Sequence, residues 1–194
     1  MKKLFLILLL SISSAYSFEP TNFTGTKEEL RSFFDELWGK FKDFDNYHCY
    51  RRAHILANEM VHKDVQSMKV FFFKGSKLIM PMDWYYHVAP MVNYKNEPVV
   101  LDKGLFEGAT YLKDWLYSFG EGHACKEITS MDEYREFKTT EYCMYFIVPM
   151  YYYSPKDLES LNLDSFVQSD LKDMLFSLPR RQRSRYLSQF PIKD

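Results

Sequence analysis

Residues 45–62 are DNYHCYRRAHILANEMVH, and they place a cysteine at the start of a predicted helix. Asp45 and Asn46 are residue types that cap helices, because their side chains accept hydrogen bonds from the first backbone N–H groups. We expect a helix from about Tyr47 to His62, with Cys49 in its first turn. The unpaired N–H groups and the helix dipole at that end stabilise an anion, so they favour a thiolate and can also bind an oxyanion.

A second helix is predicted just before this segment. Thr26-Lys27-Glu28-Glu29 has the spacing of a capping box, in which the Thr side chain accepts from a first-turn N–H group and Glu29 reaches back to the cap. Apolar side chains then recur at helical spacing: Leu30, Phe33, Phe34, Leu37, Trp38 and Phe41. We therefore expect an amphipathic helix over residues 27–41.

Short β-rich runs follow the cysteine helix. They are Met68–Phe73, Lys77–Met80, Trp84–Asn93 and Pro98–Leu101, and the separators are Gly75-Ser76, Pro81 and Lys95-Asn96. β-branched and aromatic residues favour strands, whereas Gly, Pro and Asn favour the turns between them. These runs predict an antiparallel sheet.

The last part of the chain returns to helical spacing. Ala109–Phe119 predicts a helix, Cys143–Tyr153 predicts a strand, and Ser154-Pro155 predicts the start of helical structure that continues to Phe190. No repeat or Pro/Gly-rich linker divides the chain, and its length is typical of one domain. A helix, a sheet and further helices in this order predict a single α+β domain over residues 18–194.

The first residues have the pattern of a secretory signal peptide. Lys2 and Lys3 give a basic start, Leu4–Ile12 is a short apolar stretch, and Ala15-Tyr16-Ser17 has small residues at the alternating positions that signal peptidase recognises. The apolar stretch is too short to span a bilayer. We expect residues 1–17 to be removed and the protein to be secreted or periplasmic. An uncleaved anchor or a frayed apolar N-terminus is the alternative.

The expected mature chain is close to neutral. The 194-residue sequence has 25 Lys and Arg against 26 Asp and Glu. Residues 1–17 contain two lysines and no acid, so 23 basic and 26 acidic side chains remain, a formal charge of −3. The basic run Arg180–Arg185 is interpreted as a solvated helix face. Nucleic acid is therefore not expected as the main partner, because phosphate binding needs a net or clustered basic surface.

The sequence has three cysteines, an odd number for a protein in an oxidising compartment. Cys125 and Cys143 lie in segments predicted as neighbouring loop and strand, and Cys49 lies apart among polar and basic residues. We expect a Cys125–Cys143 disulfide and a free Cys49. A free thiol is either a nucleophile or a passive buried residue. His123 with Cys125 and Cys143 could instead form part of a zinc site, but no fourth ligand has a familiar spacing.

A thiolate nucleophile needs a base, and His87 is the best candidate. It lies in the predicted strand Trp84–Asn93, and Asp102 ends the next strand. If the two strands pair as a hairpin, His87 and Asp102 are neighbours on one face, and the carboxylate can orient the imidazole toward the sulfur. His54, on the Cys49 helix, is interpreted as a structural partner. A single histidine in a strand is often structural, so the assignment of His87 as the base depends on its combination with the free Cys49 and with Asp102 at the end of a strand.

Three short motifs contain these residues: Cys49-Tyr50-Arg51-Arg52-Ala53-His54, His87-Val88-Ala89-Pro90 and Val99-Val100-Leu101-Asp102. In this order and spacing, over residues 45–105, they resemble the secreted bacterial protein-glutaminases, or protein-glutamine deamidases. The resemblance implies that Cys49 is the nucleophile, His87 the base and Asp102 the residue that orients it. It also implies an α+β fold related to the transglutaminase and papain-like enzymes, in which the cysteine helix packs on an antiparallel sheet. The family has a sizeable pro-region, whereas little more than one helix separates the predicted signal peptide from Cys49 here.

The activity that this resemblance implies is hydrolysis of glutamine side chains in proteins or peptides to glutamate and ammonia, through a cysteine thioester. No metal or organic cofactor is expected. The expected partners are proteins or peptides with exposed glutamine, and the enzyme is expected to be a monomer. Trp84 and Tyr86 are expected to line the substrate groove, although both could equally be core residues.

Two alternatives remain open at the level of sequence. A cysteine peptidase or a transglutaminase would use the same three residues. These enzymes differ in which carbonyl group of the substrate enters the active site, and in whether water or an amine reacts with the thioester. A non-catalytic exported binding module, with an inert Cys49, is the alternative from another class. Thiol labelling separates the two classes, because an inert thiol reacts slowly and an activated one rapidly.

The signal-peptide prediction is tested by the N-terminus of the exported protein. Cleavage after Ser17 leaves Phe18 as the first residue, and N-terminal sequencing of protein released from the periplasm or medium should find it there. Protein in those fractions that still begins at Met1 would contradict the prediction.

Overall fold

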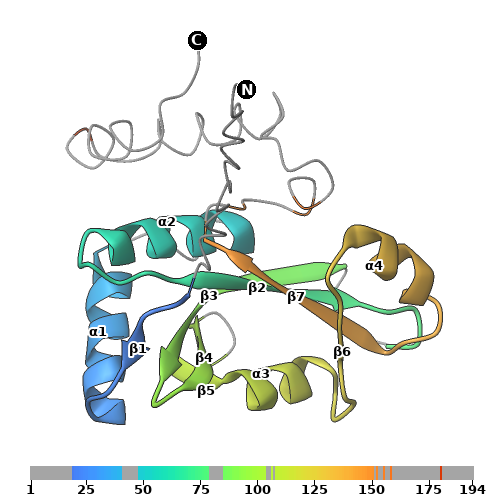
Figure 1. Cartoon of the computed structure of the whole chain (residues 1–194), viewed down its shortest axis with the longest axis horizontal. Coiled ribbons are helices and arrows are strands. Elements are labelled where there is room, and N and C mark those ends of the chain that lie inside the picture. The colour runs from blue at the N-terminus through green and yellow to red at the C-terminus, as the bar shows by residue number, and fades with distance from the viewer. Residues whose placement is uncertain are drawn as a thin grey trace, which may run out of the picture.

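The computed structural model of the chain describes residues 19–40, 48–78, 85–103, 106, 108–150, 152, 155, 158 and 180. The predicted signal peptide, Trp84 and nearly all of the predicted C-terminal helical region lie outside these residues. In chain order the described elements are β1 (Asn22–Phe23), α1 (Lys27–Gly39), α2 (Cys49–Val61), β2 (Met68–Lys74), β3 (Tyr86–Tyr94), β4 (Glu97–Asp102), β5 (Gly108–Tyr111), α3 (Leu112–Phe119), β6 (Lys126–Glu127), α4 (Met131–Phe137) and β7 (Cys143–Pro149). The predicted α+β class is confirmed (Figure 1).

The strands form one sheet in the order β5-β4-β3-β2-β7-β6, and β1 pairs with β3. The long central strands are antiparallel, because β2 pairs in that sense with both β3 and β7. The short pairs β1–β3 and β6–β7 are parallel. The expected antiparallel sheet is therefore confirmed for its central part, and two short parallel pairs are added at β1 and β6.

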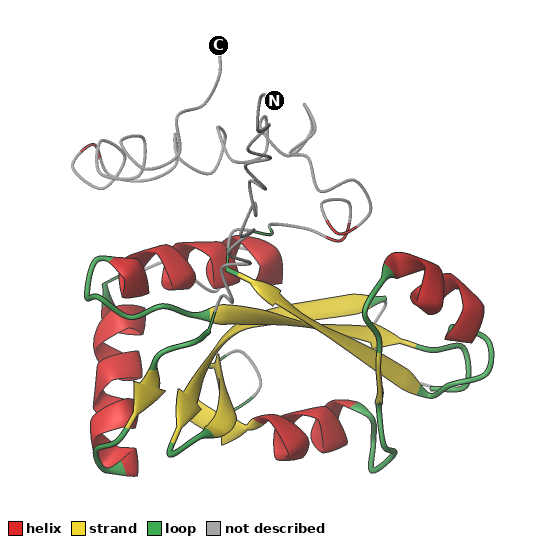
Figure 2. Ribbon diagram, in the orientation of Figure 1, coloured by secondary structure: helices red, strands yellow, loops and turns green. Residues whose placement is uncertain are grey.

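The central strand β2 is covered on both faces, which explains its unbroken aromatic and aliphatic sequence. Val70 and Phe72 belong to a buried cluster with Trp115 of α3. Phe71 and Phe73 point to the opposite side and belong to a cluster that contains residues of α2 and α4. Helices accordingly lie on both sides of the sheet (Figure 2), so alternation of apolar and polar residues is lost in β2.

Helix α1 packs beside the cysteine helix through the apolar positions that its periodicity predicts. Leu30, Phe34 and Leu37 are buried, at spacings of four and three residues, and they share a cluster with Ile55 and Met60 of α2. The capping box is present, with the N–H of Glu29 donating to the Thr26 side chain and the N–H of Thr26 donating to the Glu29 carboxylate. The predicted helix over 27–41 is confirmed except at its C-terminal end, since it ends at Gly39.

Helix α2 is the most deeply buried helix segment of the described chain. Every residue from Ala53 to Met60 is buried. The predicted cap residues Asp45 and Asn46 lie outside the described residues. The helix begins at Cys49, and its N-cap residue is His48, which makes no side-chain capping hydrogen bond. The helix contacts β3 and β2, so packing on the sheet stabilises it.

Three of the predicted boundaries differ from the structure, and strand pairing explains the first of them. Residues 109–111 were expected in a helix, but they belong to β5, where Tyr111, Thr110 and Ala109 pair with β4. The expected strand Lys77–Met80 is not formed in its described part, because Lys77 lies in a turn and Leu78 has no regular structure. The β7 strand ends at Pro149, short of the expected Tyr153.

Helix α4 was not predicted, although its sequence contains a cap signal. The Ser130 side chain accepts a hydrogen bond from the N–H of Glu133, which has the Ser-x-x-Glu spacing of a helix start. The strands β1 and β6 were also not predicted, because each has only two residues. No helix in the described part of the chain is long and apolar enough to cross a membrane.

The capping box gives a direct test of the N-terminal helix. Thr26→Ala removes the side-chain acceptor for the Glu29 N–H, so the free energy of unfolding should fall by about 1 kcal/mol in urea denaturation. Thr26→Ser keeps the hydroxyl and serves as the control, with a smaller loss. Equal losses in the two variants would show that the hydrogen bond does not contribute.

Candidate active site

Cys49 is the first residue of α2, and its thiol is free. The side chain is half-buried and packs against the cluster that contains Phe71 and Val88. The first intrahelical hydrogen bond of α2 runs from the Arg52 N–H to the His48 carbonyl, so the preceding N–H groups lie at the open end of the helix. The helix N-terminus therefore presents hydrogen-bond donors next to the sulfur, as the sequence predicts.

His87 and Asp102 are brought together by the β3–β4 hairpin. The turn consists of Lys95 and Asn96, both with positive φ (51° and 67°), which is the conformation that matches the twist of the flanking strands. The strand register pairs Met91 with Val100, and β3 residues two apart share a face. His87 and Asp102 consequently lie diagonally across one face, where their side chains can meet.

The two side chains form a buried hydrogen bond. His87 Nε2 lies 2.9 Å from Asp102 Oδ2, and the side chains are 2% and 6% exposed. A carboxylate at this distance fixes the ring orientation and holds a proton on Nε2. Because Asp102 occupies Nε2, Nδ1 is the ring nitrogen left for the hydrogen bond that joins His87 to Cys49. The structure thus brings together all three residues of the predicted triad.

Trp115 is a member of this constellation that the sequence did not indicate. Its indole Nε1 donates a hydrogen bond of 3.0 Å to the same oxygen, Asp102 Oδ2, and its side chain is fully buried. Phe119, one turn further along α3, stacks on the His87 ring with a centroid distance of 5.0 Å. Helical spacing identified both residues as apolar-face positions. A buried indole N–H needs an acceptor, and that requirement is the signal that could have linked Trp115 to a polar site.

The electrostatics of His87 favour the imidazolium. Burial lowers its pKa, but the hydrogen bonds to Asp102 and Cys49 and the negative charge of both groups outweigh burial and raise the pKa to about 9. The ring therefore retains two protons at neutral pH. An imidazolium between a carboxylate and a sulfur can stabilise a thiolate and later donate a proton to a leaving group.

A second buried polar group lies under α2. The Lys69 side chain is fully buried, and its Nζ donates to the Tyr152 carbonyl at 2.6 Å and lies 3.0 Å from His54 Nδ1. Burial, and secondarily the Lys69 charge, hold the pKa of His54 well below its usual value. His54 is therefore neutral and accepts from Lys69. This agrees with its interpretation as a structural partner.

The remaining predicted site residues have separate outcomes. The Cys125–Cys143 disulfide is confirmed, so these sulfurs are not available for the alternative zinc site. Tyr86 is half-buried at the start of β3, and its ring lies 6.3 Å from that of Phe71, as a core residue would. Trp84 lies outside the described residues. The proposed role of Trp84 and Tyr86 in substrate binding is a prediction that this geometry does not test.

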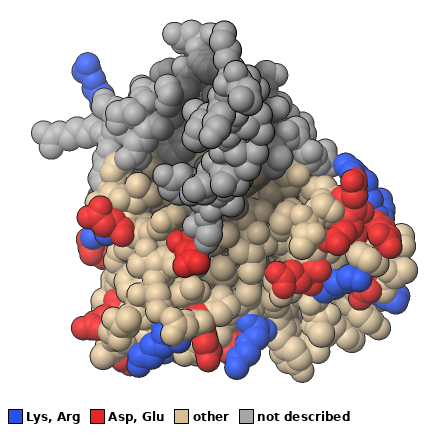
Figure 3. Space-filling view, in the orientation of Figure 1, with Lys and Arg blue, Asp and Glu red and all other residues tan. Residues whose placement is uncertain are grey.

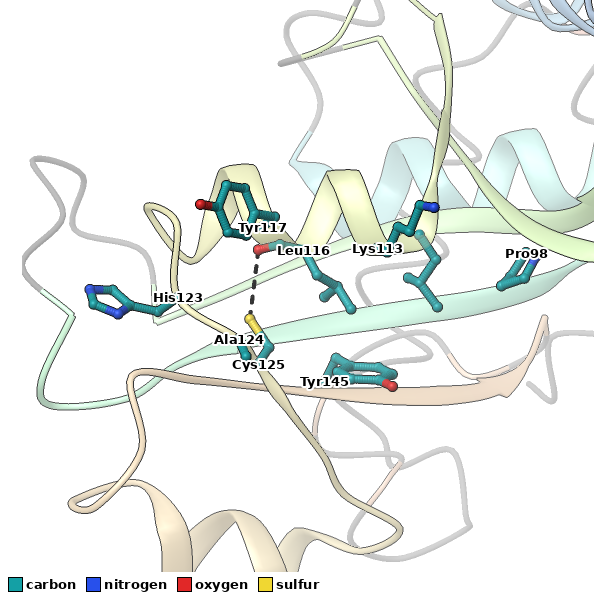
Figure 4. Close-up of a pocket in the computed structure, with 9 residues that line it drawn as sticks. Pro98, Lys113, Leu116, Tyr117, His123, Ala124, Cys125 and Tyr145 are labelled. Atoms are coloured by element: carbon teal, nitrogen blue, oxygen red, sulfur yellow. Dashed lines mark hydrogen bonds between the residues drawn. The ribbon is translucent and has the colours of Figure 1, made fainter.

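A pocket of about 350 Å³ lies beside α3. Figure 4 shows the residues that line it, among them Pro98, Leu116, Tyr117, Cys125 and Tyr145. None of the three triad residues lines this pocket. It is therefore distinct from the space around Cys49.

The charges on the described surface agree with the near-neutral composition. On the face shown in Figure 3, acidic and basic side chains are intermixed around the margin. Several are paired, as Lys63 is with Glu36 and Lys103 with Asp35. This pattern does not favour binding of a polyanion.

Residues 36–119, which include Cys49, His87 and Asp102, match a protein-family model described as glutaminase. This part of the chain, called the glutaminase-type segment below, is similar to that family. The chain is also similar to protein-glutaminase from Chryseobacterium proteolyticum, whose NMR structure aligns with a TM-score of 0.46 and 22% identity, over 70% of this chain and 78% of that chain. No curated protein sequence matches the chain. The family match confirms the resemblance noted in the three motifs of the glutaminase-type segment.

The His87 environment predicts an unusual titration. In NMR spectra of the histidine rings, the His87 signal, assigned by its loss in His87→Gln, should titrate with a midpoint of about 9. Asp102→Asn removes the main group that raises the pKa, so the midpoint should move to lower pH. A wild-type midpoint at the ordinary value of about 6.5 would contradict the geometry.

The same shift makes stability depend on pH. The pKa of His87 is higher in the folded than in the unfolded protein. Its contribution to the free energy of unfolding is therefore complete below pH 6.5 and is lost as pH rises toward 9. The loss in unfolding free energy should be on the order of 3 kcal/mol, and the slope should be smaller in Asp102→Asn.

Proposed function

We propose that this protein is a protein-glutamine deamidase, which hydrolyses the side-chain amide of glutamine in proteins or peptides to glutamate and ammonia. The observation that supports this most strongly is the placement of His87 between Cys49 and Asp102 inside a segment of glutaminase type. A thiol, an imidazole and a carboxylate in this order are the parts that nucleophilic acyl transfer requires.

In the first half of the proposed reaction, the Cys49 thiolate attacks the carbonyl carbon of the glutamine carboxamide. A C–S bond forms, and the carbonyl oxygen becomes an oxyanion. The N–H groups at the start of α2 stabilise that charge. His87, as imidazolium, transfers the Nδ1 proton to the amide nitrogen. The C–N bond breaks, ammonia leaves, and a thioester remains on Cys49.

In the second half, water resolves the thioester. Neutral His87 accepts a proton from water through Nδ1, and the resulting hydroxide attacks the thioester carbonyl. The C–S bond breaks, glutamate is released, and the Cys49 thiolate and the His87 imidazolium are restored. Asp102 retains its charge throughout and stabilises the imidazolium at Nε2.

We also propose that the enzyme acts outside the cytoplasm. The Cys125–Cys143 disulfide supports an oxidising compartment, and the signal-peptide pattern of residues 1–17 agrees with that location. In this setting the substrates are proteins or peptides that expose glutamine side chains.

Substitutions in the triad should separate the roles of its members. Cys49→Ala should abolish ammonia release while the protein stays folded, because alanine is well tolerated in a helix. Asp102→Asn should retain more activity, with kcat reduced by roughly 10²–10⁴-fold, because the ring is misoriented but still present. Ammonia assays with a Gln-containing peptide and an unfolded protein measure both effects, and circular dichroism checks the fold.

The identity of the product distinguishes this function from its rivals. Mass spectrometry of a Gln-containing protein should show glutamate in place of glutamine and an intact backbone. Backbone cleavage would indicate a cysteine peptidase, and crosslinks to lysine would indicate a transglutaminase. An unchanged substrate together with slow labelling of Cys49 would support a binding module instead.

A further inference from the structure

Helix α3 contacts both the Asp102–His87 pair and the disulfide. Trp115 donates to Asp102 Oδ2, and Phe119 stacks on His87. Cys125 Sγ lies 3.7 Å from the Leu116 carbonyl oxygen, as the dashed line in Figure 4 shows. One short helix therefore connects two features that the proposed mechanism treats separately.

The C-terminal end of α3 is pressed closely against the disulfide. A Cβ atom at Gly120 would lie 2.9 Å from Cys143 Sγ and 2.6 Å from the His123 carbonyl oxygen, so a larger residue does not fit there. Cys143 is fully buried and belongs to the same apolar cluster as Trp115 and Phe119. The disulfide is thus part of the surface on which this end of α3 rests.

The two ends of α3 are held in different ways. Its first residue, Leu112, directly follows β5, whose residues pair with β4, so the N-terminal end is fixed to the sheet. After Phe119 the chain turns through Glu121 and Gly122, both with positive φ, before it reaches Cys125. Two attachments then close this turn onto the sheet: the bond from Cys125 to Cys143 of β7, and the pairing of β6, which directly follows Cys125, with β7. A helix of eight residues is too short to be stable alone, so its position depends on these attachments.

We propose that Trp115 is a positioning residue for the Asp102–His87 pair, and that the Cys125–Cys143 disulfide holds it in place through α3, so that the site is complete only in the oxidised protein. The kinetic part of this inference rests on the proposed function, whereas the structural part does not. In the proposed reaction Trp115 contacts neither Cys49 nor the substrate. It fixes the Asp102 carboxylate, which in turn fixes the His87 ring.

The redox step is ordinary thiol–disulfide exchange. A dithiol supplies two electrons and two protons, the Sγ–Sγ bond breaks, Cys125 and Cys143 become thiols, and the dithiol leaves as its own disulfide. In a reducing compartment the enzyme would lack the Cys125–Cys143 disulfide and have low activity. Oxidation after export would complete the site, which would protect the glutamine side chains of the producing cell.

The first test compares the oxidised and the reduced full-length mature protein. Dithiothreitol normally preserves cysteine enzymes, because it keeps the nucleophile reduced. Here it should lower kcat by about tenfold or more, with KM changed by less than about twofold. The His87 NMR titration should move from about 9 to lower pH. The double variant Cys125→Ala/Cys143→Ala should behave in the same way without reductant.

The second test isolates the indole N–H. Trp115→Phe keeps an aromatic ring in the cluster but removes the donor to Asp102, so both kcat and the His87 titration midpoint should fall. Trp38→Phe, in α1 and outside the apolar cluster that contains Trp115 and Phe119, is the matched control and should change neither. Near-UV circular dichroism confirms that each variant is folded.

The outcomes separate this inference from the proposed function. If Trp115→Phe and the reduced protein keep wild-type kcat and a His87 midpoint of about 9, the positioning role is wrong. If the midpoint falls in both but the oxidised wild type releases no ammonia, the positioning role stands and the proposed function fails. Restoration of the midpoint and of kcat on reoxidation supports the role of the disulfide, even if the double variant does not fold.

Discussion

The hydrogen bond between His87 Nε2 and Asp102 Oδ2, 2.9 Å long and almost fully buried, is the interaction on which the site depends. It exists because the Lys95-Asn96 turn sets the register of β3 and β4. It also decides which nitrogen of the ring is available to Cys49. A buried charged pair is costly unless further hydrogen bonds satisfy it, and the indole of Trp115 supplies one to the same oxygen. The β3–β4 hairpin and Trp115 of α3 therefore hold this pair in position.

The nucleophile is positioned by burial of its helix. Residues from Ala53 to Met60 are all buried, so α2 cannot rotate or shift without disturbing the contacts with the sheet and α1. The buried Lys69 adds a directional restraint, since it joins β2 to His54 of α2 and to the carbonyl of Tyr152. Cys49 thus occupies a defined point at the open end of a fixed helix.

The sequence predicted those features that depend on local pattern or on cysteine chemistry. Helix α1 and its capping box, the β3–β4 hairpin, the disulfide and the grouping of Cys49, His87 and Asp102 follow from spacing, turn residues, the odd number of cysteines and the glutaminase resemblance. The features it missed depend on long-range contacts. Residues 109–111 have helical spacing but pair with β4, and the partner of the Trp115 indole is set by where α3 crosses that strand. The start of α2 at Cys49 was also missed, because its N-cap residue, His48, makes no side-chain capping hydrogen bond that a sequence pattern could reveal.

The proposed reaction passes through a thioester between Cys49 and a glutamine side chain, and this intermediate can be trapped. The enzyme is mixed with a Gln-containing peptide, quenched with acid within one turnover, digested and analysed by mass spectrometry. The peptide that contains Cys49 should carry an adduct with the mass of the whole substrate less ammonia, and Cys49→Ala should carry none. Ammonia release that persists in Cys49→Ala, or an adduct of only part of the substrate backbone, would contradict the proposed reaction.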